Sequence, residues 1–209
     1  YAVMVPDPPI LHVEQSEVRQ RLAQYEETHG PLQSVRMLSP GPNWASLTGY
    51  AAYPAYLGIG PAEYFDPQLI MPEPTDEMSP DERTAARQAQ HEWLREGAFT
   101  HVLSLEPLEE AEWPQAELVW QGFDRLLNAV YARWQEPIFL YELSQTLPRV
   151  RLSGAGSIEA QPTAREEMAL TLTAIEPTEL IRAELAYPGW KAHVATDAGT
   201  QTIETASGL

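Results

Sequence analysis

The sequence predicts an α+β protein, with a mixed α/β part over residues 1–146 and an antiparallel, β-rich, sandwich-like part over residues 147–209. Three observations predict this class. Two segments of the first part combine helix-capping signals with apolar residues at helical spacing. Short apolar segments typical of strands lie between and after them. Beyond residue 147, apolar and polar residues alternate as they do in half-buried strands.

The first helix is predicted from Ser16, a residue type that caps helix N-termini, to about His29, and Gly30 then stops it. Its inward face has three apolar residues at helical spacing, which are Val18, Leu22 and Tyr25. A short strand is expected over residues 34–38. The aromatic stretch over residues 44–65 has neither a helical nor a strand period, so we interpret it as irregular structure.

The strongest local signal is a capping box, in which Ser79 caps a helix, Pro80 takes its first position and Glu82 its third. We expect this helix to end near Glu96. Its buried stripe is predicted to consist of Ala85, Ala86, Ala89, Trp93 and Leu94. The segments that follow are predicted strands over residues 99–105, 118–120 and 138–143 and an amphipathic helix over residues 123–134.

The second part has the pattern of antiparallel strands. Apolar and polar side chains alternate over residues 168–174 and 181–187, and each segment is followed by a proline turn, at Pro177 and Pro188. The small residues 153–157 (SGAGS) are the predicted hinge between the two parts.

The composition is that of a globular protein with a strong negative charge. Among 209 residues, 13 are basic and 30 acidic, which gives a formal charge of −17. This balance argues against nucleic acid as a partner, because such binding needs a phosphate-neutralising surface. It also disfavours docking on anionic lipid. The absence of cysteine excludes disulfides, thiolate metal sites and cysteine nucleophiles.

The sequence predicts no catalytic residue, cofactor or metal site. His91 lacks the second histidine four residues later that a zinc-protease helix requires, so we interpret it as part of a solvated helix face. His101 alternates with apolar neighbours and is interpreted as a hydrogen-bonded sheet residue. Neither a GxSxG nucleophile motif nor a glycine-rich phosphate loop that opens a helix occurs.

The aromatic stretch over residues 44–65 is the one segment of the chain with an unusual composition, because it is rich in aromatic residues. Aromatic rings with polar tips suit sugar rings and lipid head-group boundaries, and the alternative is that they pack the joint between the two parts. If the chain binds glycan, the predicted contacts are Trp44, Tyr50, Tyr53 and Tyr56, with Arg36 and Asn43 as polar partners.

Several segments in order resemble the extracytoplasmic region of the YfhO family of bacterial multi-spanning membrane proteins. They are residues 35–38 (VRML), 42–50 (PNWASLTGY), 99–103 (FTHVL), 141–143 (YEL), 147–150 (LPRV) and 187–194 (YPGWKAHV). The last is the most specific. We interpret its residues as structural: Pro188 and Gly189, after Tyr187, form a turn between two strands, and Trp190 then packs across the β layer.

The resemblance implies a parent that resembles membrane glycosyltransferases using lipid-linked sugars, located on the extracytoplasmic face of the bacterial membrane. No segment matches the early loop in which such enzymes hold their catalytic acid, so this domain is expected to be non-catalytic. Its expected partners are the membrane-embedded remainder of the same polypeptide and a glycan or lipid-linked sugar. We expect the chain to be a piece of a longer protein, whose open sheet edge allows self-association. The alternative is a non-enzymatic carbohydrate-binding module of the periplasm or cell surface.

Overall fold

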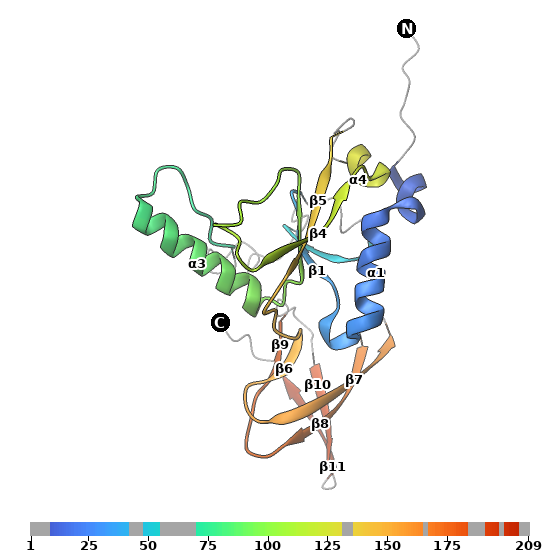
Figure 1. Ribbon diagram of the computed structural model, residues 1–209. Helices are drawn as coiled ribbons and strands as arrows, with labels where there is room; N and C mark the ends of the chain where they lie inside the picture. Colours follow the sequence, from blue (N-terminus) through green and yellow to red (C-terminus); the bar gives the residue numbers. More distant parts are fainter. Residues whose placement is uncertain are drawn as a thin grey trace.

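A computed structural model describes residues 9–41, 48–54, 70–130, 136–164, 167–183, 191–196 and 199–204. It confirms the predicted α+β class. Figure 1 shows a central sheet between the helices α1 (Glu17–His29) and α3 (Pro80–Glu96), with the C-terminal strands gathered at one end of it.

Among the described residues, the central sheet has five strands in the order β2-β1-β3-β5-β4. Their bounds are β1 Arg36–Leu38, β2 Ala51–Tyr53, β3 His101–Ser104, β4 Ala116–Gly122 and β5 Ile138–Leu143. The strand β1 is parallel to both of its neighbours, and β5 is antiparallel to both of its own. The strands β1, β3, β4 and β5 confirm the sequence prediction. The prediction was wrong for β2, which lies in the stretch interpreted as irregular, because its three residues are too few to set a period.

The helix caps confirm the sequence signals. Ser16 accepts a hydrogen bond from the backbone N–H of Arg19 at 3.1 Å, and Gly30 ends α1 with a positive φ of 74°. In α3 both halves of the capping box are formed between Ser79 and Glu82. The predicted stripe of α3 was partly wrong. Its most buried residues are Gln90 and Leu94, whereas the predicted Ala85 and Ala89 are exposed.

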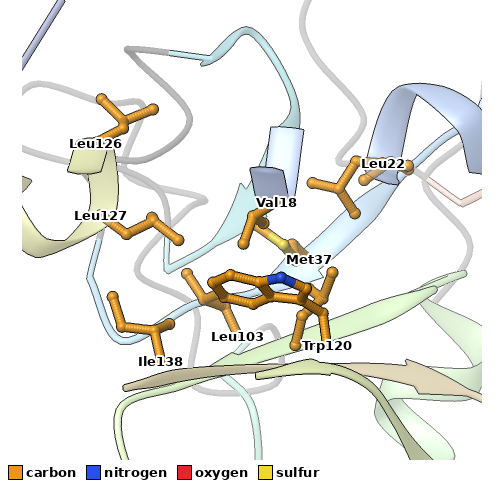
Figure 2. Close-up of a cluster of buried hydrophobic side chains, with 10 residues drawn as sticks. Val18, Leu22, Met37, Leu103, Trp120, Leu126, Leu127 and Ile138 are labelled. Atoms are coloured by element: carbon orange, nitrogen blue, oxygen red, sulfur yellow. The ribbon is translucent and has the colours of Figure 1, made fainter. Parts of the chain in front are cut away.

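The two faces of the sheet build two apolar cores, and β5 shows why. Successive side chains of a strand point to opposite faces, so Ile138 and Leu140 enter one core while Phe139 and Tyr141 enter the other. The first core lies under α1. Figure 2 shows its members Val18, Leu22, Met37, Leu103, Trp120, Leu126, Leu127 and Ile138. The second core lies under α3 and contains Met71, Leu94, Phe99, Val102, Trp113, Phe139, Tyr141 and Leu143.

The described residues of the first part also contain short helical segments. They are η1 (Pro9–Gln15), η2 (Pro31–Gln33) and α4 (Arg125–Val130). The helix predicted over residues 123–134 is described only as α4, and its first residue, Phe123, is 53% exposed and precedes it. The residues 131–135 lie outside the described ranges.

The C-terminal part consists of antiparallel strand pairs, as predicted. The pairs are β6 (Val150–Leu152) with β9 (Leu180–Arg182), β7 (Gly156–Ala164) with β8 (Glu167–Ala174), and β10 (Lys191–Thr196) with β11 (Gly199–Glu204). Within the described ranges each of these sheets has two strands. Pairing of such strand edges with another copy stays a prediction.

A backbone hydrogen bond joins this β-rich part to the first part, because the N–H of Arg149 donates to the carbonyl of Leu32 at 2.8 Å. Within the β-rich part, the N–H of Ala183 donates to the carbonyl of Arg149, also at 2.8 Å. The ladder of β6 with β9 therefore begins where the chain leaves the first part.

Candidate functional site

The structure does not bring the predicted sugar-binding residues together within its described ranges. Trp44, Asn43 and Tyr56 lie outside those ranges. Tyr50 packs against the core under α1, whereas Tyr53 packs against the core under α3. These two rings therefore lie against opposite faces of the sheet. The motif of Tyr187, Pro188, Gly189 and Trp190 also lies outside the described residues.

Tyr53 is held by its neighbours on the α3 side. Its ring lies 5.0 Å from that of Trp93 and 6.5 Å from that of Phe99, measured between centroids. Its hydroxyl oxygen accepts a hydrogen bond from the backbone N–H of Met71 at 3.3 Å. Tyr50 is half-buried on the other face, and burial, followed by the charge of Glu26, raises the pKa of its hydroxyl. Both rings pack against the cores of the central sheet, whereas the alternative to sugar binding was that they pack the joint between the two parts.

Arg36, the predicted polar partner, lies at the joint between the two parts. One of its terminal nitrogens donates to the carbonyl oxygens of Gly97 and Ala183, at 2.6 and 2.5 Å. Its guanidinium carbon lies 5.5 Å from the centroid of the Phe99 ring, within cation–π range.

A surface hollow of about 320 Å³ lies between α3 and the chain segments that flank β4 and β5. Its lining residues are Gln88, His91, Glu92, Leu94, Arg95, Phe99, Pro114, Gln115, Leu143, Ser144, Gln145 and Thr146. Leu94, Phe99 and Leu143 are buried members of the second core. The hollow thus combines apolar surface with polar groups, which is the composition of small-molecule sites.

Two polar side chains of this hollow are incompletely paired. The His91 Nε2 and Gln115 Nε2 atoms are buried and have no hydrogen-bond partner among the described residues. The backbone of Glu112 bonds the His91 ring, and since Nε2 has no partner, we assign this bond to Nδ1. A buried polar atom without a partner costs about 1–3 kcal/mol, so a bound group that supplies the missing partner is favoured.

The surroundings of His91 favour the neutral form of its ring. Burial, and then the nearby guanidinium of Arg87, lowers the pKa of His91, and the bond to the Glu112 backbone opposes this only in part. With Nδ1 donating to Glu112, the neutral ring has a lone pair on Nε2 and is a hydrogen-bond acceptor there. The ring centroid lies 5.3 Å from that of Trp113, in a tilted arrangement.

The interpretation of His91 as a solvated side chain was therefore wrong. The sequence signal that would have found its position is Leu94, the most buried residue of α3, because His91 lies one turn before it on the same face.

The opposite wall of the hollow is fixed by hydrogen bonds to the backbone. The Ser144 hydroxyl donates to the carbonyl of Gln115 at 3.1 Å, and the Thr146 hydroxyl donates to the carbonyl of Phe99 at 2.8 Å. Both oxygens keep lone pairs that can accept further hydrogen bonds. Gln145, between them, has a positive φ of 64°, a conformation that residues other than glycine seldom adopt.

The charged groups at the hollow are paired with one another. Arg95 donates to both carboxylate oxygens of Glu92, at 3.0 and 2.6 Å. The guanidinium of Arg87, beside the His91 ring, donates to Glu112 and to Gln90 and lies over the Trp113 ring. The hollow therefore presents hydrogen-bonding groups with little net charge.

Two further observations concern the described residues as a whole. No group of three or more His, Asp or Glu side chains within these ranges is arranged to hold a metal ion. In the same ranges, no helix has the length and apolar character needed to cross a membrane.

Comparisons with known proteins give no match: no protein-family model fits the chain, and neither a curated protein nor a solved structure is significantly similar to it.

Proposed function

We propose that the chain is a non-catalytic, glycan-binding extracytoplasmic domain of a bacterial polytopic membrane protein that resembles the YfhO family. In this proposal the parent transfers sugar from a lipid carrier, and the domain recognises the acceptor or covers the membrane-embedded site. The observation that carries the binding role is the hollow beside α3, with its uncharged donors and acceptors and its apolar base.

The chemistry of the hollow supports a neutral, hydroxyl-rich ligand. A sugar hydroxyl both donates and accepts, and the hollow offers an amide donor at Gln115 and acceptors at His91, Ser144 and Thr146. Phe99 and Leu143, which are buried in the second core, form part of the apolar base of the hollow. The pairing of Arg95 with Glu92 disfavours a ligand with net charge.

The test is a titration with neutral sugars, monitored by NMR of the ¹⁵N-labelled domain. Glucose, galactose and N-acetylglucosamine are each added to about 10 mM, a concentration suited to the millimolar affinities of small polar ligands. We expect at least one sugar to shift the amide signals of residues 91–95 and 143–146. The absence of any such shift would overturn the hollow as the sugar site.

A matched pair of variants makes this test specific. Gln115→Leu removes the amide of the hollow and is expected to weaken binding about tenfold, since a lost hydrogen bond costs about 1–1.5 kcal/mol. Gln121→Leu replaces an exposed glutamine of β4 that does not line the hollow and should leave binding unchanged. Equal losses in both variants would mean that the sugar binds elsewhere or nonspecifically.

The membrane context has its own test. Sequencing the parent reading frame on both sides of this chain should reveal several apolar segments of about 20 residues, each long enough to span a bilayer. A nearby signal peptide and stop codon would instead favour the alternative, a free-standing carbohydrate-binding module of the periplasm or cell surface.

A further inference from the structure

Phe99 connects the base of the hollow with the joint between the two parts of the chain. It is buried and lines the hollow, and its ring lies 5.1 Å from the Trp93 ring, measured between centroids. Its backbone carbonyl accepts a hydrogen bond from the Thr146 hydroxyl, which belongs to the opposite wall, at 2.8 Å. A shift of Phe99 would therefore change both the base and one wall of the hollow.

The side chain of Arg36 holds Phe99 from the side of the joint. Its guanidinium carbon lies 5.5 Å from the centroid of the Phe99 ring. One terminal nitrogen donates to the carbonyl of Gly97, at the end of α3, at 2.6 Å. The same nitrogen donates to the carbonyl of Ala183, the residue directly after β9, at 2.5 Å. One side chain of β1 thus contacts the end of α3, the base of the hollow and the β-rich part.

The backbone of Arg36 is fixed as well, so the side chain starts from a defined position. The Arg36 carbonyl accepts from the Thr100 N–H at 2.9 Å, and the Arg36 N–H donates to the Thr100 hydroxyl at 3.2 Å. Arg36 itself does not line the hollow. Its contacts with Phe99 and Gly97 are therefore the route by which it acts on a ligand bound there.

We propose that Arg36 is a positioning residue for the hollow, and that through it ligand binding depends on the docking of the β-rich part. This inference rests on the proposed function, which makes the hollow the sugar site. Arginine suits the role because a planar guanidinium stacks on a ring and donates hydrogen bonds from its edge at the same time. Without Arg36, the Phe99 ring loses the group that lies over it and the carbonyls of Gly97 and Ala183 lose a shared donor.

The test uses two variants that disturb Phe99 from different sides, in the same NMR titration with glucose, galactose and N-acetylglucosamine. Arg36→Gln removes the guanidinium. Gly97→Ala keeps the carbonyl that Arg36 bonds but places a methyl carbon 2.8 Å from the Phe99 Cε2 atom, so that the ring has to move. The φ of Gly97 is −71°, which alanine adopts without strain. We expect each variant to weaken sugar binding at least about fivefold. Unchanged affinity in both would overturn the proposal.

A conservative variant and a matched control separate this role from a general weakening of the joint. Arg36→Lys keeps the charge and one strong donor but not the planar fork, so it should recover only part of the affinity. Arg151→Gln removes another arginine of the joint, whose guanidinium donates to the Glu96 carboxylate, and should leave affinity within about twofold of the wild type. An equal loss in Arg151→Gln and Arg36→Gln would refute the specific role of Arg36.

The dependence on the β-rich part has a readout of its own, which is hydrogen exchange of the Ala183 N–H. This group donates to the Arg149 carbonyl at 2.8 Å. Coupling between two sites is reciprocal, so a sugar that binds more tightly to the docked form must also slow this exchange. We expect saturating sugar to slow it severalfold in the wild type and not in Arg36→Gln.

The outcomes distinguish failure of this inference from failure of the sugar site. If a sugar shifts the signals of the hollow in the wild type but leaves the exchange of the Ala183 N–H unchanged, the sugar site stands and the coupling through Arg36 is wrong. If no sugar shifts those signals in the wild type, the proposed function fails, and this inference fails with it.

Discussion

Replacing Asp124 by alanine is expected to lower the free energy of unfolding strongly. Asp124 is 2% exposed and links two helices. One of its carboxylate oxygens accepts from the Ser16 hydroxyl at 2.8 Å and from the Val18 N–H at 3.2 Å, at the start of α1. The other accepts from the Leu127 N–H of α4 at 3.1 Å.

The size of the effect follows from these three bonds. Hydrogen bonds to a charged group contribute about 1.5–3 kcal/mol each, and a buried donor left without an acceptor costs about 1–3 kcal/mol. The three hydrogen bonds share one carboxylate, so their free-energy contributions are not additive. We therefore expect Asp124→Ala to lower the free energy of unfolding by about 3–5 kcal/mol, the range found when one partner of a buried charged network is removed. Asp124→Asn keeps one oxygen acceptor and should cost less, about 2 kcal/mol.

The assay is equilibrium unfolding in urea followed by circular dichroism, with the m-value fitted for each variant. Asp76→Ala, at an exposed aspartate before α3, is the matched control and should lie within about 0.5 kcal/mol of the wild type. A double-mutant cycle with Ser16→Ala then measures the coupling between the two helices. A loss below about 1 kcal/mol for Asp124→Ala at an unchanged m-value would refute the assignment of this carboxylate as the link.

Two further predictions concern pH and core packing. Burial, and then the charge of His29, lowers the pKa of His101 from 6.5 to about 4. Between these two pH values only the unfolded chain takes up the proton, so the free energy of unfolding falls as the pH falls. The contribution of neutral His101 to stability, up to about 3 kcal/mol, is therefore complete above pH 6.5 and is lost as the pH falls toward 4. His101→Asn should flatten this part of the curve when unfolding free energies are compared at several pH values, and an unflattened curve would contradict the assignment. Leu140→Ala, at a fully buried residue of β5, should cost about 2–5 kcal/mol, whereas Leu172→Ala, at a residue 41% exposed, should cost under about 1 kcal/mol in the same urea assay.

The elements that the sequence predicted well are those specified by neighbouring residues. The capping box of Ser79 and Glu82 needs only four consecutive positions. The predicted strand over residues 138–143 coincides with β5 because its run of apolar residues is itself long enough to be recognised as a buried strand. The α+β class followed from the same local signals. The strand β2 could not be found in this way, because its three residues become a strand only by pairing with β1.

The candidate site was less predictable because its residues are distant in the sequence. The buried stripe of α3 was placed on alanines, but the sheet contacts the face that contains Gln90 and Leu94. That rotation of the helix brings His91 to the hollow, where Gln115 and Thr146 arrive from two other segments. The spacing of apolar residues within one segment cannot predict a contact between residues of three separate segments. The contact of Arg36 with the carbonyl of Ala183 could not be predicted for the same reason, since the two residues are 147 positions apart in the sequence.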